Sequence, residues 1–308
     1  MNAWEARGAQ HIVLLSVCIL AMVFSGADQL VRAQPAIDPP ANMRQAPGDD
    51  HPPLWFDEVS FSEAVRNAPP TAEAAGHVVG GIIPHHWFAG HLITAFFAGL
   101  AAQEHPKTII LIGPNHTNSG LARMLTSDRA WSTPFGRVEA DLDIIGALLE
   151  TGLVELGGDA LTPEHSVAGI MPAIRYYLPA ARVVPIILAG SIGLAEAERL
   201  AVALTPLLDE DTVLVAAVDF SHYLVQSEAS VRDELTLEAL RSFDSARLFT
   251  LGNDYLDSPP SIAVLLEAMR LVGSDSLALF ENTNSGLLAG DELSPTTSYF
   301  AGYYHRSK

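Results

Sequence analysis

Cysteine and positive charge are what this sequence has least of. Its one cysteine is Cys18, which excludes an intrachain disulfide and a zinc knuckle built from several thiolates. Lysine occurs only as Lys107 and Lys308, and 36 Asp and Glu residues outnumber 17 Lys and Arg residues, for a net charge of −19. Nucleic-acid binders need a basic face, so no nucleic-acid partner is expected. The 11 histidines instead make a histidine-and-carboxylate metal site the first hypothesis.

The N-terminal residues are predicted to lie outside the folded domain. Residues 12–24 form an apolar run that is shorter than the roughly 20 residues needed to span a bilayer, and small residues follow it. Residues 1–33 are therefore expected to be a signal peptide or an N-terminal membrane anchor, giving an exported or membrane-anchored protein. A misassigned start codon would instead leave a cytoplasmic protein. Residues 34–58 are rich in proline and are predicted to be a linker.

From residue 59 onward, short apolar runs alternate with segments of helical periodicity. The predicted strands are 78–84, 108–113, 183–188, 213–220, 277–280 and 298–304. The predicted helices are 90–103, 140–150, 166–177, 194–208, 226–242, 245–251 and 260–272. Continuous apolar strands separated by helices indicate a mostly parallel sheet covered by helices on both faces. We therefore predict that residues 59–308 form one α/β domain, a three-layer sandwich.

Three of the predicted strands are followed by histidine. His85 and His86 come after the first strand, His116 after the second, and Asp219 and His222 at the end of the fourth. In such sheets ligands bind beyond the carboxyl ends of the strands. These residues are therefore expected to meet at one rim of the sheet.

The candidate metal ligands are His85, His116 and Asp257. Each histidine follows a proline at a strand end, and a neutral imidazole binds Fe(II), Zn(II) or copper well. His86 competes with His85, and the sequence does not separate these neighbours. Asp257 precedes a predicted helix, so it is either the third ligand or the N-cap of that helix. Two histidines and a carboxylate would leave positions open for substrate and dioxygen on Fe(II), or for water on Zn(II).

Three further residues are candidates for catalytic roles. His222 titrates near neutrality and could transfer protons at a bound substrate. Asp219 could orient a ring nitrogen, as carboxylates around metal ligands do. His165 opens a predicted helix and either lines the pocket or belongs to the helix cap. A hydrolytic triad of Ser221, His222 and Asp219 is disfavoured, because no GxSxG turn is present.

Seven segments follow one another from about residue 80 to residue 300, namely GGIIPHHWFAGH, TIILIGPNHTNSG, WSTPFG, EHSVAGIMPAIRYYLP, VDFSHYL, NDYLDSPPSI and TTSYF. Together they resemble the Memo-like family, in particular its bacterial members called AmmeMemoRadiSam system protein B. That family is similar in fold to class III extradiol dioxygenases, which implies a three-layer α/β sandwich with a metal at the strand ends. The resemblance implies metal ligands at His85 and His116. It aligns the animal Memo cysteine ligand with Asp257 and the dioxygenase base with His222.

Two departures from the family pattern matter. Animal Memo has PHAGY where this chain has PHHWF at 84–88, so the pocket shape must differ. A carboxylate in place of the cysteine favours Fe(II), Mn(II) or Zn(II) over Cu(I). The implied function is a metal-dependent, dioxygenase-like oxidoreductase acting on a small molecule. The alternatives are a Zn(II)-dependent hydrolase at the same site and a non-enzymatic metal- or partner-binding protein.

The family name also implies partner proteins of the radical-SAM and AMMECR1-domain types. Those partners would be cytoplasmic, which conflicts with the expected export of this chain. Any contact with a membrane is expected only through the N-terminal segment.

Overall fold

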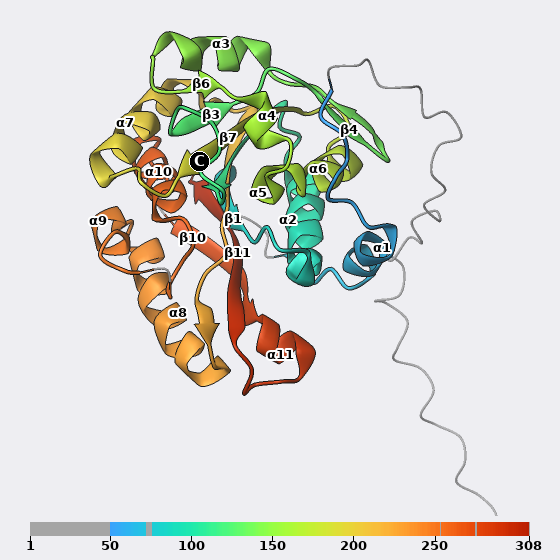
Figure 1. Cartoon of the computed structure of the whole chain (residues 1–308), viewed down its shortest axis with the longest axis vertical. Coiled ribbons are helices and arrows are strands. Elements are labelled where there is room, and N and C mark those ends of the chain that lie inside the picture. The colour runs from blue at the N-terminus through green and yellow to red at the C-terminus, as the bar shows by residue number, and fades with distance from the viewer. Residues whose placement is uncertain (1–49, 72–75, 253, 275, 308) are drawn as a thin grey trace, which may run out of the picture. The chain divides into compact units, whose positions relative to one another are not determined.

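A computed structural model of the 308-residue chain describes residues 50–71, 76–252, 254–274 and 276–307 (Figure 1). The predicted signal peptide or anchor, residues 1–33, lies outside the described residues, as does most of the predicted linker. Within the described part of the chain, no helix is both long and apolar enough to cross a bilayer.

The domain is built on a nine-stranded sheet with the strand order β10-β11-β1-β8-β2-β7-β3-β6, and β9 pairs with β11. The strands are β1 (His77–Ile83), β2 (Thr108–Asn115), β3 (Met124–Thr126), β6 (Glu155–Leu156), β7 (Arg182–Ala189), β8 (Thr212–Ala217), β9 (His222–Leu224), β10 (Ser276–Asn284) and β11 (Thr296–Arg306). A separate hairpin joins β4 (Trp131–Thr133) to β5 (Gly136–Val138).

The centre of the sheet is parallel, and the edge strand β6 is parallel to β3. Strands β1, β8, β2 and β7 run parallel to one another, whereas β11 is antiparallel to β1 and β3 is antiparallel to β7. Every residue of β2 and β8 is buried, because helices cover both faces there. This double burial explains why these strands are continuously apolar in the sequence rather than alternating. The predicted α/β sandwich is confirmed, with a sheet that is mixed at its edges.

Helices flank the sheet on both faces (Figure 1). They are α1 (Glu58–Arg66), α2 (Gly90–Gln103), α3 (Leu142–Glu150), α4 (Gly158–Leu161), α5 (His165–Ala168), α6 (Met171–Tyr177), α7 (Leu194–Leu204), α8 (Gln226–Arg241), α9 (Ser245–Leu248), α10 (Pro259–Leu271) and α11 (Ser285–Ala289). Short 3-10 turns form η1 (Trp87–Ala89) and η2 (Thr205–Leu207). Helices α7, α8 and α10 contribute to the large apolar core on one face, while α1 and α6 pack on α2.

Three predicted helices are shorter than expected. The segment 166–177 is divided into α5 and α6, with a break at Gly169 and Ile170. The segment 194–208 is α-helical only to Leu204, and 245–251 only to Leu248. The break matters for function, because it turns a short helix, α5, toward the carboxyl ends of the strands.

The last part of the predicted linker packs on the domain. His51 is fully buried and stacks on Trp131 with ring centroids 3.9 Å apart. Trp55 donates a hydrogen bond from Nε1 to the carbonyl oxygen of Pro163 at 3.0 Å. The unpredicted helix α1 then begins after Asp57, whose side chain caps it. This segment therefore borders the loop that leads into α5.

Candidate metal centre

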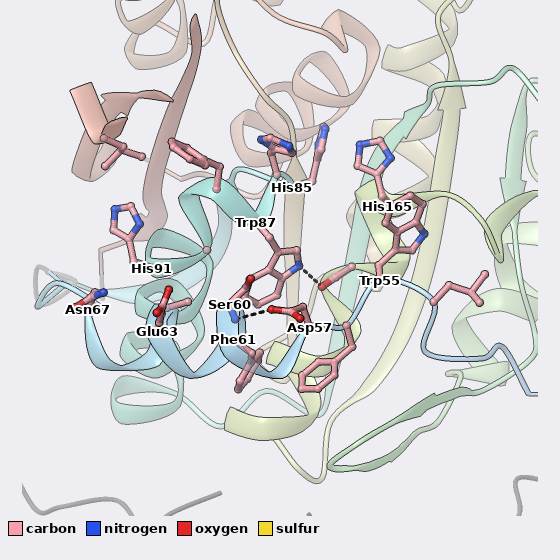
Figure 2. A pocket seen from close by; sticks show the side chains of 18 residues that line it. Trp55, Asp57, Ser60, Phe61, Glu63, Asn67, His85, Trp87, His91 and His165 are labelled. Atoms are coloured by element: carbon pink, nitrogen blue, oxygen red, sulfur yellow. Dashed lines mark hydrogen bonds between the residues drawn. The ribbon is translucent and has the colours of Figure 1, made fainter. Parts of the chain in front are cut away.

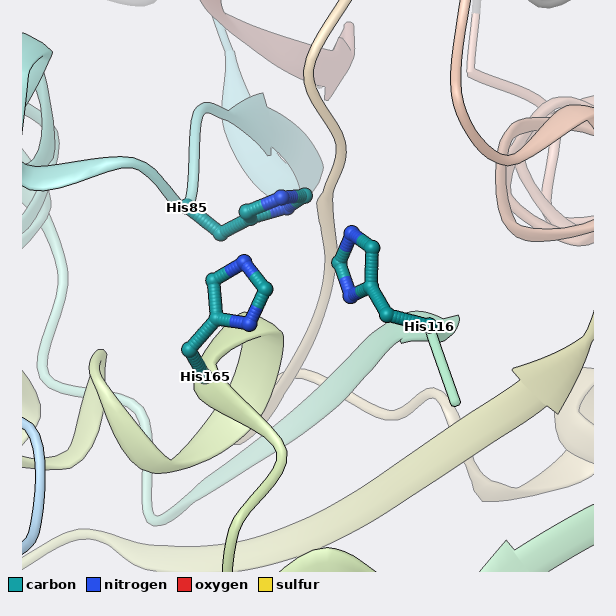
Figure 3. A group of neighbouring side chains, drawn as sticks. All are labelled: His85, His116 and His165. Carbon is teal, nitrogen blue, oxygen red and sulfur yellow. The ribbon is translucent and has the colours of Figure 1, made fainter. Parts of the chain in front are cut away.

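Three imidazoles meet at the carboxyl ends of the central strands (Figure 3). His85 follows β1, His116 follows β2, and His165 is the first residue of α5. The ring centroids of His85 lie 5.0 Å from those of His116 and His165, and the latter two rings stack 4.3 Å apart. Each ring offers a nitrogen within 4.8 Å of the other two. His86 is exposed, and its Nδ1 lies 3.2 Å from the Tyr299 hydroxyl instead.

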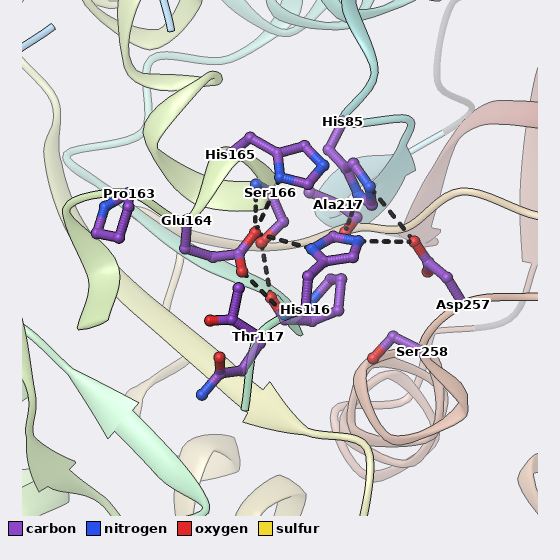
Figure 4. Close-up of polar contacts among 12 residues, drawn as sticks. His85, His116, Thr117, Pro163, Glu164, His165, Ser166, Ala217, Asp257 and Ser258 are labelled. Carbon is purple, nitrogen blue, oxygen red and sulfur yellow. Dashed lines mark hydrogen bonds and ion pairs between the residues drawn. The ribbon is translucent and has the colours of Figure 1, made fainter. Parts of the chain in front are cut away.

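Asp257 faces two of these rings (Figure 4). Its Oδ2 lies 3.3 Å from His85 Nε2 and 3.5 Å from His116 Nε2. Asp257 does not cap α10, because the side chain of Ser258 accepts the backbone N–H of Ser261 in that role. The side chain of Asp257 is thus free to serve the cluster.

The surroundings of Asp257 suit a cation. Both of its carboxylate oxygens are buried, and neither has a hydrogen-bond partner among the described residues. A buried carboxylate without hydrogen bonds is costly unless a positive charge faces it. Two ligand atoms that are each about 2.1 Å from one ion lie about 3.0 to 3.4 Å apart at angles of 90 to 109°. The observed distances of 3.3 and 3.5 Å from Oδ2 to the two Nε2 atoms are close to this range.

Hydrogen bonds at Nδ1 decide which nitrogen of each ring is available. His85 Nδ1 lies 3.1 Å from the carbonyl oxygen of Ala217, which can only accept a hydrogen bond. His116 Nδ1 lies 2.8 Å from Glu164 Oε1. Both contacts favour a proton on Nδ1, so in the neutral rings the lone pairs lie on the two Nε2 atoms that face Asp257.

Glu164 belongs to the cluster as well, and the sequence did not predict it. Besides His116 Nδ1, its carboxylate accepts the backbone N–H of His116 at 2.9 Å and that of Ser166 at 3.0 Å. It therefore caps α5 and orients His116 at the same time. The only signal in the sequence was its place next to His165, before a predicted helix.

The charges of Glu164 and His116 support each other. Burial favours the neutral acid of Glu164, but hydrogen bonds from His116 and Ser166 outweigh it and hold its pKa at about 2. Burial also opposes a charge on His116, but contacts with Asp257 and Glu164 raise its pKa to about 10. The two carboxylates thus attract positive charge to this position, which a metal cation can supply in place of a proton.

His165 is held in its neutral form. Burial, followed by the nearby rings of His85 and His116, lowers its pKa to about 4. Its Nδ1 lies 3.3 Å from Glu164 Oε1. His165 is therefore a neutral third imidazole on the side of the cluster opposite Asp257.

Asp219 supports the backbone of His85 rather than its ring. It is buried, and its Oδ1 accepts the backbone N–H of His85 at 3.1 Å, whereas its Oδ2 is 3.8 Å from His85 Nε2. Burial raises the pKa of Asp219, and the neighbouring charge of Asp257 acts in the same direction. The contacts that orient the rings come from Ala217 and Glu164 instead.

His222 stands at the edge of the cluster. It lies in β9, opposite Thr297 of β11, and Tyr223 beside it has a left-handed backbone with φ of 61°. Its Nδ1 is buried and has no hydrogen-bond partner in the described part of the chain. Burial lowers its pKa, against the opposite pull of Asp257 and Asp219. His222 is therefore a neutral imidazole with a free ring nitrogen.

A cavity of about 780 Å³ reaches this cluster (Figure 2). His85 and His165 form part of its wall, and further lining residues come from the segment before α1, from α1, η1 and α2, and from α11. The cluster is thereby accessible to a small molecule.

Comparison with known proteins identifies the family. The family model described as Memo-like protein matches residues 60–303. A MEMO1 family protein of Methanopyrus kandleri is 29% identical over 77% of this chain and 87% of its own length. A MEMO1 family protein of Aeropyrum pernix is 31% identical over 68% of this chain and 78% of its own. An uncharacterized protein of Escherichia coli K12, known from a crystal structure, covers 72% of this chain and 99% of its own, with a TM-score of 0.48 and 16% identity. From the family match, this chain belongs to the Memo-like protein family.

Proposed function

We propose that this protein is a metal-dependent oxidoreductase that binds a divalent cation, preferably Fe(II), through His85, His116 and Asp257. The observation that carries the proposal is the approach of two imidazole Nε2 atoms to one buried carboxylate oxygen, at 3.3 and 3.5 Å. Two histidines and one carboxylate are the donor set of non-haem Fe(II) oxygenases. In that set, Fe(II) supplies open positions for substrate and dioxygen.

The residues around the ligands prepare them for a cation. In the neutral rings, Ala217 and Glu164 favour protonated Nδ1 atoms, so that each Nε2 can present its lone pair to a metal, which on His116 would take the place of the second proton. The low pKa of Glu164, about 2, keeps its carboxylate charged at neutral pH. Removing such orienting groups typically lowers metal affinity about 10- to 100-fold.

His222 is the proposed proton acceptor. Its pKa is lowered, so it is neutral at pH 7, and its Nδ1 has no partner among the described residues. A neutral imidazole of this kind can take a proton from a substrate hydroxyl and return it later. His165, also neutral, borders the cavity and would contact the substrate.

Metal analysis and oxygen consumption test this function together. Protein purified without oxygen and loaded with Fe(II) is expected to bind one ion and to consume dioxygen with a member of a catechol panel. His116→Ala is expected to lose both properties, whereas His222→Ala keeps the metal and loses turnover. Full metal binding by His116→Ala overturns the proposed site. Metal binding without turnover of any panel member would leave a metal-binding protein and overturn the enzymatic role.

A Zn(II)-dependent hydrolase is the second candidate, because His165 provides a third imidazole. The ring nitrogens of His85, His116 and His165 lie within 4.8 Å of one another, and three histidines form the donor set of some catalytic zinc sites. His165→Ala separates the candidates. The variant keeps its metal affinity if Asp257 is the third ligand, and loses it if His165 is.

A further inference from the structure

The cavity beside the metal centre has aromatic walls. Phe61 of α1 and Trp87 of η1 lie with ring centroids 5.6 Å apart, and Trp87 is fixed by a hydrogen bond from Nε1 to the Gly169 carbonyl oxygen at 2.9 Å. Trp55 stands opposite, with its ring centroid 5.4 Å from that of His165 (Figure 2). A planar ring can therefore bind between apolar surfaces and reach the histidine cluster.

The charged side chains that line the cavity are acidic. Asp57 and Glu63, at the start and in the middle of α1, line it and are exposed to solvent. The backbone N–H of Ser60 keeps the pKa of Asp57 below its usual value. Among the described residues, neither lysine nor arginine lines the cavity. Burial lowers the pKa of His91, another lining residue, so this imidazole adds no positive charge at neutral pH.

The aromatic walls and the acidic side chains together favour a positively charged ligand over a negatively charged one. In the metal-free protein, a carboxylate or phosphate would enter next to two negative side chains and meet no lysine or arginine among the described lining residues. An ammonium group is attracted to the same side chains and to the faces of the aromatic rings. The net charge of −19 over the whole chain acts in the same direction at longer range.

We propose that this cavity, hereafter the substrate pocket, binds a small aromatic amine, with its ring between Trp55 and Trp87 and its ammonium group toward Asp57 and Glu63. The substrate class rests on the proposed function, since it is the metal centre that would act on a ring bound here. The pocket itself depends only on residues of the protein, so its binding can be measured with or without a metal.

Part of the pocket lies outside the region that matches the family. That match begins at residue 60, whereas Trp55 and Asp57 come from the segment before it. His85 and His165, by contrast, lie within the matched region.

Three probes of similar shape test the selection. Calorimetric titration of the full chain, metal-free and metal-loaded, compares 2-phenylethylamine, 2-phenylethanol and 3-phenylpropionate. At low salt the metal-free protein is expected to bind the amine about fivefold more tightly than the alcohol, and the carboxylate more weakly than both. The advantage of the amine should shrink to about twofold or less at 1 M salt, where screening is strong.

Matched variants show which residues cause the preference for the amine. Asp57→Asn keeps the cap of α1, since asparagine caps as well as aspartate, and Glu63→Gln keeps the size of the side chain. The variant that carries both substitutions is expected to bind the amine and the alcohol with equal affinity. Glu210→Gln is the control, because it removes one exposed negative charge before β8, at the opposite ends of the strands. Trp55→Ala is expected to weaken all three probes about threefold or more.

Two results would overturn the proposal. One is binding of the carboxylate to the metal-free protein as tight as that of the amine, and the other is failure of all three probes to bind. An equal effect of Glu210→Gln and Glu63→Gln would also overturn the assignment to the pocket. Because the metal-free protein is titrated as well, probe binding can be measured even if the protein binds no metal. Normal metal binding without probe binding would refute the substrate pocket but not the metal centre.

Discussion

Glu164 accepts a hydrogen bond from Nδ1 of His116 at 2.8 Å across 48 positions of the sequence, while Nε2 of the same ring faces Asp257 at 3.5 Å. The ring therefore stands between two carboxylates. One carboxylate sets the position of its proton, and the other faces the nitrogen that is proposed to bind the metal.

Glu164→Gln tests the orienting role. The one oxygen of glutamine can still accept from His116 Nδ1 and cap α5, but its amide group cannot accept the backbone N–H of His116. Glutamine also lacks the negative charge that helps to raise the pKa of His116. We expect metal affinity to fall about 10-fold or more, as for other groups that orient metal-bound histidines. Competition with a chelator of known affinity measures the change. Glu155→Gln, which removes an exposed charge on β6, is the control, and an equal affinity of both variants would contradict the role.

Asp257 and Ser258 are neighbours with separable roles. Ser258→Ala removes the cap of α10 and is expected to lower the free energy of unfolding by about 1 kcal/mol while metal affinity stays unchanged. Asp257→Asn keeps the cap and is expected to lose most of the metal affinity. Chemical denaturation of the metal-free proteins and metal titration provide the two readouts. The reverse pattern, with metal lost in Ser258→Ala and kept in Asp257→Asn, would show that Asp257 is no ligand.

Gly113 lets α5 approach β2 closely. A Cβ atom at this position would lie 2.6 Å from Ser166 Oγ and 2.8 Å from Ser166 Cβ. Gly113→Ala is expected to push α5, and with it Glu164, away from His116, at a cost of about 1 to 3 kcal/mol in stability. Metal affinity should fall with it.

Gly146→Ala is the matched control for this effect. Nothing lies within 4 Å of a Cβ at Gly146, which is inside α3, so alanine should stabilise that helix by up to about 1 kcal/mol. Its metal affinity should equal that of the wild type. Unchanged metal affinity in Gly113→Ala would show that the position of α5 does not control the site.

The sequence predicted the parts of the site that depend on local pattern. The central strands were recognisable because burial on both faces makes them continuously apolar. His85 and His116 could be found because each follows a proline at the end of such a strand. Asp257 could be named as a candidate from its position before α10, and the contacts of Ser258 then exclude its alternative role as the cap.

What the sequence did not predict depends on distant contacts. The pairing of Glu164 with His116 has no local signature, because the two residues meet only when α5 packs on β2. The helix α1 lies at the end of a segment rich in proline, and its stability comes from packing on α2. Strands β3, β6 and β9 have two or three residues each, too few for a period to be read.

His51 connects the segment before α1 to the stability of the domain. Its ring nitrogens lie 2.7 Å from Ser127 Oγ and 2.7 Å from Thr162 Oγ1, and the ring is fully buried against Trp131. Burial, aided by the nearby charge of Arg129, lowers the pKa of His51 from 6.5 to about 4. The folded protein therefore holds this imidazole in its neutral form.

This shift predicts that His51 makes the folded protein less stable in acid. A substitution at this one residue tests the prediction. Between pH 6.5 and pH 4 the unfolded chain binds a proton at His51 that the folded chain does not, so a falling pH favours unfolding. Below pH 4 the shift lowers the free energy of unfolding by its full amount, about 3 kcal/mol, and above about pH 7 it has no effect. His51→Gln removes the titrating group, so its free energy of unfolding should approach or exceed that of the wild type as the pH falls. Denaturant titrations of both proteins at pH 7.5 and pH 4 measure this difference, and a difference that does not change with pH would mean that His51 titrates alike in both states.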